Sequence, residues 1–133
     1  QPEMSAVELT DLLIPEIENK TADFICLNYA NADMVGHTGV WKAAIKAVET
    51  VDKCVQRVVT AGLQNGYTIF LTADHGNSDY LINEDGTPNT AHTMNNEWNG
   101  KITQGKLGDI ASTILKMMGL TIPSEMSGNV LID

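Results

Sequence analysis

The chain has 133 residues, 43% of them hydrophobic, which is enough for one domain with a buried core. Its formal net charge is −9 with only eight lysines and arginines. Nucleic acid and anionic membranes are therefore poor partners, because neutralising phosphates requires a basic face. The apolar runs are too short to span a membrane and no basic-then-apolar leader opens the sequence, so we expect a cytoplasmic protein.

The two cysteines do not indicate a metal site. Cys26 lies in an apolar run and Cys54 on a helical pattern, and neither has metal-ligand spacing. We expect both to be buried or half-buried free thiols, which agrees with a reducing cytosol.

The first predicted element is a helix over residues 4–19. Ser5 and Glu8 have the spacing of a capping box, and Pro15 is expected to kink the helix or to end its regular part. The apolar side of this helix comprises Val7, Leu9, Leu12, Leu13 and Ile17.

A strand, a long helix and a second strand follow. Residues 23–29 and 67–73 are continuous apolar runs, typical of strands covered on both faces. Residues 38–66 have helical periodicity and end at Gly62 or Gly66. The inward side of this helix is expected to carry Trp41, Ile45, Val48, Val51, Val55, Val58 and Val59. The order predicts parallel strands with a right-handed connection, so the fold class is α/β.

The remaining elements are shorter. Residues 78–83 predict a short edge strand before a turn-rich stretch. Residues 107–120 predict a last helix with Asp109 as its N-cap and Gly119 closing it. Its inward residues are expected to be Ile110, Ile114, Leu115 and Met118. No internal repeat, linker or low-complexity tract divides the sequence, so residues 1–133 are expected to belong to one domain.

Each of the two apolar strands is followed by an acid and a histidine. Asp33 and His37 follow the first strand at a spacing that places both on one side of a helical turn, and Asp74 and His75 follow the second. Because the carboxyl ends of parallel strands lie at one edge of a sheet, these four side chains could converge. The alternatives are an exposed helical ion pair and a surface histidine in a turn.

His92, in a loop rich in hydroxyl groups, is the natural third histidine of such a site. Carboxylate oxygen combined with imidazole nitrogen suits Mn²⁺ or Zn²⁺ better than Mg²⁺ or Ca²⁺. The alternative is a loop histidine bonded to nearby hydroxyls.

Groups for catalysis and for anion binding are scarce. No serine lies in a nucleophile-elbow pattern, and Ser78 is the one serine near the expected metals. Arg57, the sole arginine, lies within a predicted helix and is more typical of a solvated side than of a phosphate clamp. A phosphate-handling enzyme built on this chain needs its guanidinium groups from elsewhere.

Four motifs in order carry a resemblance to a known family. They are NYANADMVGHTG, TADHGNSDY, GTPNTAHT and GKLGDIASTILKMMG followed by IPSEMSG. Together they resemble the C-terminal part of the cofactor-independent phosphoglycerate mutases of the alkaline phosphatase superfamily. The opening QPEMSAVELTD is similar to that family too, so the resemblance covers nearly the whole chain.

The resemblance implies a partial alkaline-phosphatase-like three-layer sandwich with a mainly parallel sheet. It implies an intact enzyme that interconverts 3- and 2-phosphoglycerate through a phosphoserine intermediate with two divalent metals, typically Mn²⁺, with Zn²⁺ or Co²⁺ as alternatives. By motif, Asp33, His37 and His92 would hold one metal, and Asp74 with His75 part of the other. The nucleophilic serine and the arginines that grip phosphoglycerate would come from an N-terminal segment and an inserted transferase domain that this chain lacks. The chain alone is then expected to be inactive.

Two departures from the family pattern stand out. Asn89 occupies a position where family members often carry histidine, which alters the surroundings of the metal ligands. After AHTMN the sequence passes directly to NEWNGK, where the family usually continues into an apolar strand. A core strand after Asn95 is therefore expected to be absent, and the exposed sheet edge would invite pairing with a second copy.

Two other readings remain open. Another superfamily member, such as a phosphopentomutase or a metal-dependent phosphatase, would share the aspartate and histidine chemistry. A metal-binding or structural module with a decayed site would belong to a different functional class, and the absent strand favours it.

Overall fold

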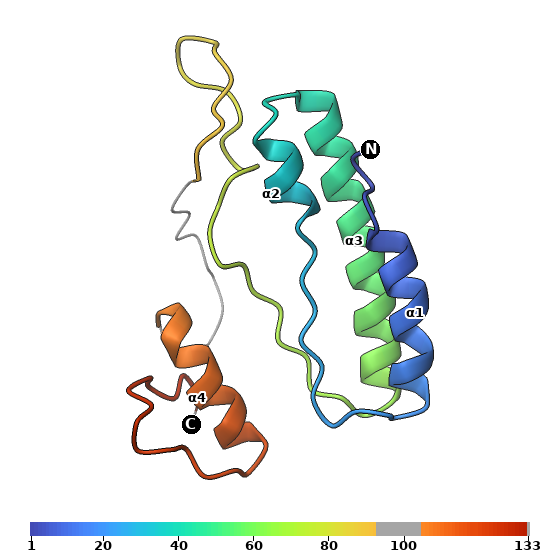
Figure 1. Ribbon diagram of the computed structural model, residues 1–133, viewed down its shortest axis with the longest axis vertical. Coiled ribbons are helices and arrows are strands. Elements are labelled where there is room, and N and C mark those ends of the chain that lie inside the picture. Colours follow the sequence, from blue (N-terminus) through green and yellow to red (C-terminus); the bar gives the residue numbers. More distant parts are fainter. Residues whose placement is uncertain (93–104, 133) are drawn as a thin grey trace. The chain divides into compact units, whose positions relative to one another are not determined.

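The computed structural model describes residues 1–92 and 105–132, which belong to two compact units, Gln1–Asn95 and Asn96–Asp133. Its helices, shown in Figure 1, are α1 (Ala6–Glu18), α2 (Asn31–Gly36), α3 (Trp41–Gln64) and α4 (Leu107–Met117). Within these two ranges, no helix combines the length and the apolar character that crossing a membrane requires.

Helix α1 forms where the sequence predicts it, but its N-terminus differs from the prediction. Ser5 is the N-cap residue, yet its side chain makes no capping hydrogen bond, so the expected capping box is not formed. Pro15 lies inside α1, which continues to Glu18. Its buried residues are Ala6, Thr10 and Ile17, whereas Leu12 is 73% exposed.

Helix α3 packs against α1 and α2 through small side chains. Its buried residues are Ala44, Ala47, Thr50, Cys54, Ala61 and Gly62. Small residues let neighbouring backbones approach closely. Larger apolar side chains in the first half of α3 are exposed instead. Trp41, Ile45 and Val48 are 43–55% exposed, so the expected inward positions of these three residues are wrong for the described part of the chain.

The end of α3 is fixed by Gly66. This residue has a φ of +83°, and the following Tyr67 N–H donates to the Gly62 carbonyl at 2.9 Å. The Gly66 N–H donates to the Leu63 carbonyl at 3.3 Å, which completes a Schellman motif. Of the two glycines expected to end the helix, Gly66 is the one that does so, because Gly62 lies buried within α3.

The predicted parallel sheet is not confirmed. Residues 23–29 and 67–73 have neither helix nor strand assignment, and no strand is assigned within residues 1–92 or 105–132. A strand exists only with a hydrogen-bonded neighbour, and the apolar side chains that a sheet would bury remain accessible here. Phe24 is 53% and Leu71 is 67% exposed.

The predicted edge strand at residues 78–83 is reduced to part of a small hairpin. Its one antiparallel bridge pairs Ile82 with Pro88. Asn83 N–H donates to the Thr87 carbonyl at 2.8 Å, and Asn89 N–H donates to the Leu81 carbonyl at 2.8 Å. Leu81 is 5% exposed and joins the small core of Val35, Ala44 and Ala47, so the hairpin is anchored to α2 and α3.

The second unit consists of α4 and the tail that follows it. Lys106, rather than Asp109, is the N-cap residue. Asp109 lies in the first turn, where its carboxylate accepts the N–H of Lys106 and the N–H of Asn129, each at 2.8 Å. Gly119 closes the helix with a φ of +69°, as its sequence position predicts. Asp109 therefore ties the start of α4 to the tail.

Candidate metal centre

Helix α2 carries two of the predicted ligands, Asp33 and His37. The helix is held at its start by Asn31, whose side-chain amide donates to the backbone carbonyls of Pro2 and Glu3 at 3.0 and 2.7 Å. Asp33 and His37 are four residues apart, and His37 Nε2 lies 3.2 Å from Asp33 Oδ1. The spacing in the sequence therefore places both groups at one point, as predicted.

The hairpin delivers His92 to the same point. His92 Nε2 lies 3.2 Å from Asp33 Oδ1 and 3.2 Å from His37 Nε2. The three atoms form a triangle with equal edges of 3.2 Å. Ligand atoms about 2.1 Å from one ion lie about 3.0 Å apart at adjacent octahedral positions and about 3.4 Å apart in a tetrahedron. The triangle has the size of three ligands on one cation.

The tautomer of His37, set by its hydrogen-bond partner, leaves Nε2 able to bind a cation at this point. His37 Nδ1 lies 2.7 Å from the backbone carbonyl of Thr90. A carbonyl can only accept, so Nδ1 carries the proton, and in the neutral ring Nε2 presents a lone pair. That lone pair faces Asp33 Oδ1, a buried oxygen that accepts no hydrogen bond in the structure. Two electron-rich atoms at this distance require a proton or a cation near them.

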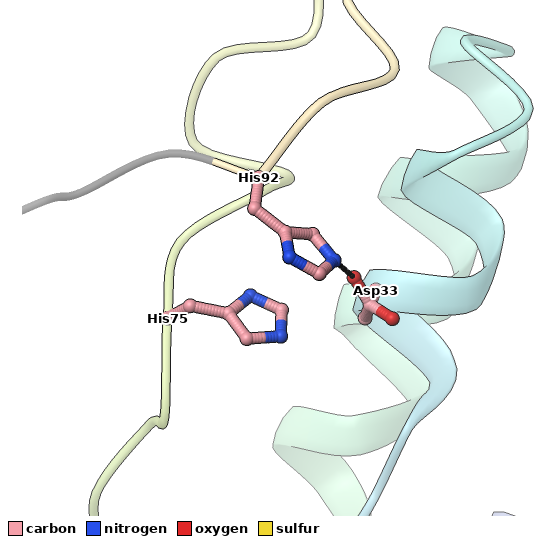
Figure 2. A group of neighbouring side chains, drawn as sticks. All are labelled: Asp33, His75 and His92. Atoms are coloured by element: carbon pink, nitrogen blue, oxygen red, sulfur yellow. Dashed lines mark ion pairs between the residues drawn. The ribbon is translucent and has the colours of Figure 1, made fainter. Parts of the chain in front are cut away.

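His75 lies beside this triangle. Its ring stacks on that of His92, with centroids 3.8 Å apart and an interplanar angle of 19°. Asp33, His75 and His92 each offer one ligand atom, and these atoms all lie within 4.8 Å of one another. Figure 2 shows the three side chains converging from α2, from the segment after residue 72 and from the end of the hairpin. The set has the mixed nitrogen and oxygen donors expected for Mn²⁺ or Zn²⁺.

Asp74 stands apart from the other predicted ligands. Its side chain is 74% exposed and its Oδ1 lies 3.7 Å from His75 Nε2. The structure thus brings Asp33, His37, His75 and His92 together, whereas Asp74 contacts the group through His75.

Two contributors to the site, Thr90 and Asn77, were not identified from the sequence, whereas Asn89 was expected to alter the surroundings of the metal ligands. Thr90 orients His37 through its backbone carbonyl, a group that every residue carries and that the sequence therefore cannot indicate. Asn89 supports the loop between them: its side-chain amide donates to the Tyr80 carbonyl at 2.9 Å, and its Oδ1 accepts the Ala91 N–H at 3.2 Å. Asn77, two residues after His75, is 6% exposed.

Comparison with known proteins gives the family of the chain. Residues 1–122 match the metalloenzyme superfamily. The chain belongs to that superfamily. Membership favours an α/β fold and divalent-metal binding, although the described residues of this metalloenzyme-superfamily chain are mainly helical.

Several relatives share one name, 2,3-bisphosphoglycerate-independent phosphoglycerate mutase. The protein of Flavobacterium psychrophilum is 57% identical over 139 residues, that of Flavobacterium johnsoniae is 52% identical over 139 residues, and that of Clostridium botulinum is 50% identical over 141 residues. Each match covers 99% of this chain and 28% of the relative. The chain therefore spans less than a third of the length of these relatives.

The matched stretches are longer than the chain itself. A match over 139 residues contains at least six positions for which this 133-residue chain has no counterpart. The strand that the family pattern predicts after Asn95 falls within residues 93–104, outside the described residues.

Proposed function

We propose that Asp33, His37 and His92 hold one divalent cation, Mn²⁺, and that Asp74 and His75 contribute to a second. The observation that carries this proposal is the 3.2 Å triangle of Asp33 Oδ1, His37 Nε2 and His92 Nε2. The hydrogen bond from His37 to Thr90 supports it, because metal-binding histidines usually donate their other nitrogen to a carbonyl or carboxylate.

The proposed activity of the intact enzyme is the interconversion of 3- and 2-phosphoglycerate. The names of relatives 46–57% identical to the chain support it. In this proposal the chain is the C-terminal portion of a phosphatase-like domain with a mainly parallel sheet, and residues 23–29 and 67–73 are strands of that sheet in the intact enzyme. An N-terminal segment and an inserted transferase domain complete it, and the chain alone is inactive.

Ser78 and Arg57 are both engaged in other contacts. This supports a nucleophile and anion-binding groups that come from outside the chain. Ser78 donates its hydroxyl hydrogen to the Ala32 carbonyl at 2.7 Å, so this serine is occupied by a structural contact. Arg57 donates to Asp11 at 2.6 Å and is likewise paired. The transferred phosphoryl group would be carried by a serine of the N-terminal segment and gripped by arginines of the transferase domain.

Each group of the proposed site has a defined task. Bound divalent cations supply Lewis acidity, which stabilises charge on phosphoryl oxygens and lowers the pKa of a serine hydroxyl. Asp33 provides the negative charge that offsets the cation, and His37 and His92 provide neutral nitrogen ligands. Stacking of His75 on His92 fixes the orientation of both rings. A mutase differs from a phosphatase in keeping water away from the reacting phosphoryl group. In this proposal the transferase domain excludes the water.

Isothermal titration with Mn²⁺ tests the metal site. The wild-type chain should release or absorb binding heat, and the His37→Ala, His92→Ala double variant should give none. A matched control is Gln56→Ala, Lys53→Ala, which changes two exposed residues of α3 and leaves the site intact. Equal heats for the wild-type chain and the histidine variant would contradict the proposal.

Reconstitution tests the activity. The chain is fused to the N-terminal segment and transferase domain of the Flavobacterium psychrophilum relative and assayed with 3-phosphoglycerate. Mutase activity that depends on His37 and His92 supports the assignment. Conversion of a pentose phosphate instead would favour a phosphopentomutase, and Mn²⁺ binding without any turnover would favour a non-catalytic metal-binding module.

A further inference from the structure

The segment that carries His75 lacks regular secondary structure. Residues 71–75 are neither helix nor strand. His75 nevertheless stacks on His92, which comes from the hairpin. Side-chain contacts just after His75 connect this segment to a neighbouring helix of the same unit.

Two such contacts join the segment to α2. Ser78 donates to the carbonyl of Ala32, the residue before Asp33, at 2.7 Å. Asn77 lies over Gly36, the last residue of α2. A Cβ atom placed on Gly36 would stand 1.7 Å from Asn77 Oδ1 and 2.8 Å from Asn77 Cγ.

Gly36 is required for space rather than for backbone conformation. Four other glycines of the described chain have a positive φ, and Gly36 is not among them. It is a buried helical residue between Asp33 and His37. Any side chain at this position would occupy the volume that the Asn77 amide now fills.

The Asn77 amide is held by this fit. The residue is 6% exposed, and neither Oδ1 nor Nδ2 has a hydrogen-bond partner in the described structure. Burial without a partner is unfavourable for an amide, so packing against the bare backbone of Gly36 is the interaction that keeps it in place.

We propose that the contact between Asn77 and Gly36 is a positioning device that seats the His75 segment on α2. Gly36 leaves the space that Asn77, the positioning residue, occupies. Their contact sets the separation between His75 and the ligands Asp33 and His92. The consequence for metal binding rests on the proposed function. The contact itself can be tested without any metal.

The first experiment measures ring proximity in the metal-free chain. In the wild-type protein, a nuclear Overhauser effect should connect the imidazole protons of His75 and His92. Gly36→Ala should abolish it, because the new methyl group displaces Asn77. The combined Gly36→Ala, Asn77→Ala variant should regain it, since the new methyl group at position 36 then fills the volume that the Asn77 amide leaves and restores the packing between the two positions. The matched control is Gly108→Ala in α4, where an added Cβ meets only the end of Lys106 at 3.8 Å.

Each result of this experiment decides the proposal. An effect retained in Gly36→Ala would overturn it, as would an effect absent from the wild-type chain or one lost in Gly36→Ala and not regained in the double variant. If Gly36→Ala fails to fold, the test depends on the double variant. A folded double variant with the ring contact supports the proposal, and an unfolded double variant contradicts it.

The second experiment measures Mn²⁺ affinity in the same four proteins. Gly36→Ala should weaken binding by about 10- to 100-fold, the range typical of residues that orient metal ligands. The double variant should recover most of this loss, and Gly108→Ala should show none. If the wild-type chain binds no Mn²⁺, the proposed function fails, while the ring-contact experiment still decides the positioning role. If the wild-type chain binds and Gly36→Ala binds equally well, the positioning role fails and the proposed function stands.

Discussion

The Nε2 atoms of His37 and His92 lie 3.2 Å apart, although 55 residues separate the two histidines in the sequence. His37 donates from Nδ1 to the Thr90 carbonyl, so its Nε2 cannot also carry a proton in the neutral ring. At most one hydrogen can bridge the two rings, and Asp33 Oδ1 stands 3.2 Å from both nitrogen atoms. Too few hydrogens are available to join all three atoms by hydrogen bonds. The same three atoms are well placed to bind one cation together.

Removing the charge of Asp33 should weaken metal binding strongly. Asp33→Asn preserves the size of the side chain but deletes the one carboxylate of the triangle. Because outer residues of metal sites already account for about 10- to 100-fold in affinity, loss of a ligand should cost at least about 100-fold. Mn²⁺ titration followed by electron paramagnetic resonance measures the free ion directly. Asp52→Asn, at an exposed position of α3, removes the same charge and should leave the affinity unchanged; similar losses in both variants would indicate a nonspecific electrostatic effect.

Asn89 should influence the site without touching the metal. Its side chain links Tyr80 to Ala91 and so shapes the loop that presents Thr90 to His37 and His92 to Asp33. We expect Asn89→Ala to reduce Mn²⁺ affinity by about 10-fold, at the lower end of the range for residues around a metal site. Asn19→Ala is the matched control, since Asn19 also donates its amide to a backbone carbonyl, that of Pro15, at the end of α1. An Asn89→Ala affinity equal to that of the control would show that the loop keeps its shape without this amide.

Asp109 should make the α4 unit sensitive to acid. The N–H groups of Lys106 and then of Asn129 bond its carboxylate and lower its pKa. A folded-state pKa below the unfolded value of about 3.9 means that the native state binds fewer protons than the unfolded state. Its stabilising contribution is therefore complete above that value and is lost as the pH falls through the lower, folded-state pKa. Urea unfolding should show Asp109→Asn less stable than the wild-type chain at neutral pH, with the difference shrinking in acid; a difference independent of pH would contradict this account.

Gly66 should be sensitive to substitution for backbone reasons alone. Its φ is +83°, and an added Cβ would meet no atom within 4 Å. Gly66→Ala should therefore destabilise the chain by about 1 kcal/mol, the cost of a left-handed conformation for an L-residue. Gly108→Ala, inside α4 without a positive φ, should instead stabilise its helix by about 0.5 kcal/mol. Thermal unfolding of both variants provides the comparison, and equal effects would show that the conformation of Gly66 is not what matters.

The helices could be predicted because their signals are local. Helical periodicity located α1, α3 and α4, and Gly66 and Gly119 mark the ends of α3 and α4 where the sequence places such signals. The predicted N-cap, Asp109, lies three positions after the actual N-cap, Lys106. A carboxylate in the first turn can accept backbone N–H groups at the start of a helix, as one at the N-cap can. Local patterns also placed Asp33 and His37 on one turn.

The sheet and the completed site depend on contacts that local patterns do not contain. The apolar runs of residues 23–29 and 67–73 are typical of strands, but a strand needs a neighbour, and none is assigned in the described ranges. The convergence of His92 with His37 depends on hairpin geometry, and the seating of His75 depends on the fit of Asn77 over Gly36. Neither relationship has a signature in sequence spacing.

The most direct measurement of the central claim is anomalous X-ray diffraction at the manganese absorption edge, on crystals of the chain grown with Mn²⁺. The account predicts an anomalous peak about 2.1 Å from each of Asp33 Oδ1, His37 Nε2 and His92 Nε2. Bound manganese elsewhere on the chain, with these three atoms free of metal, would contradict it.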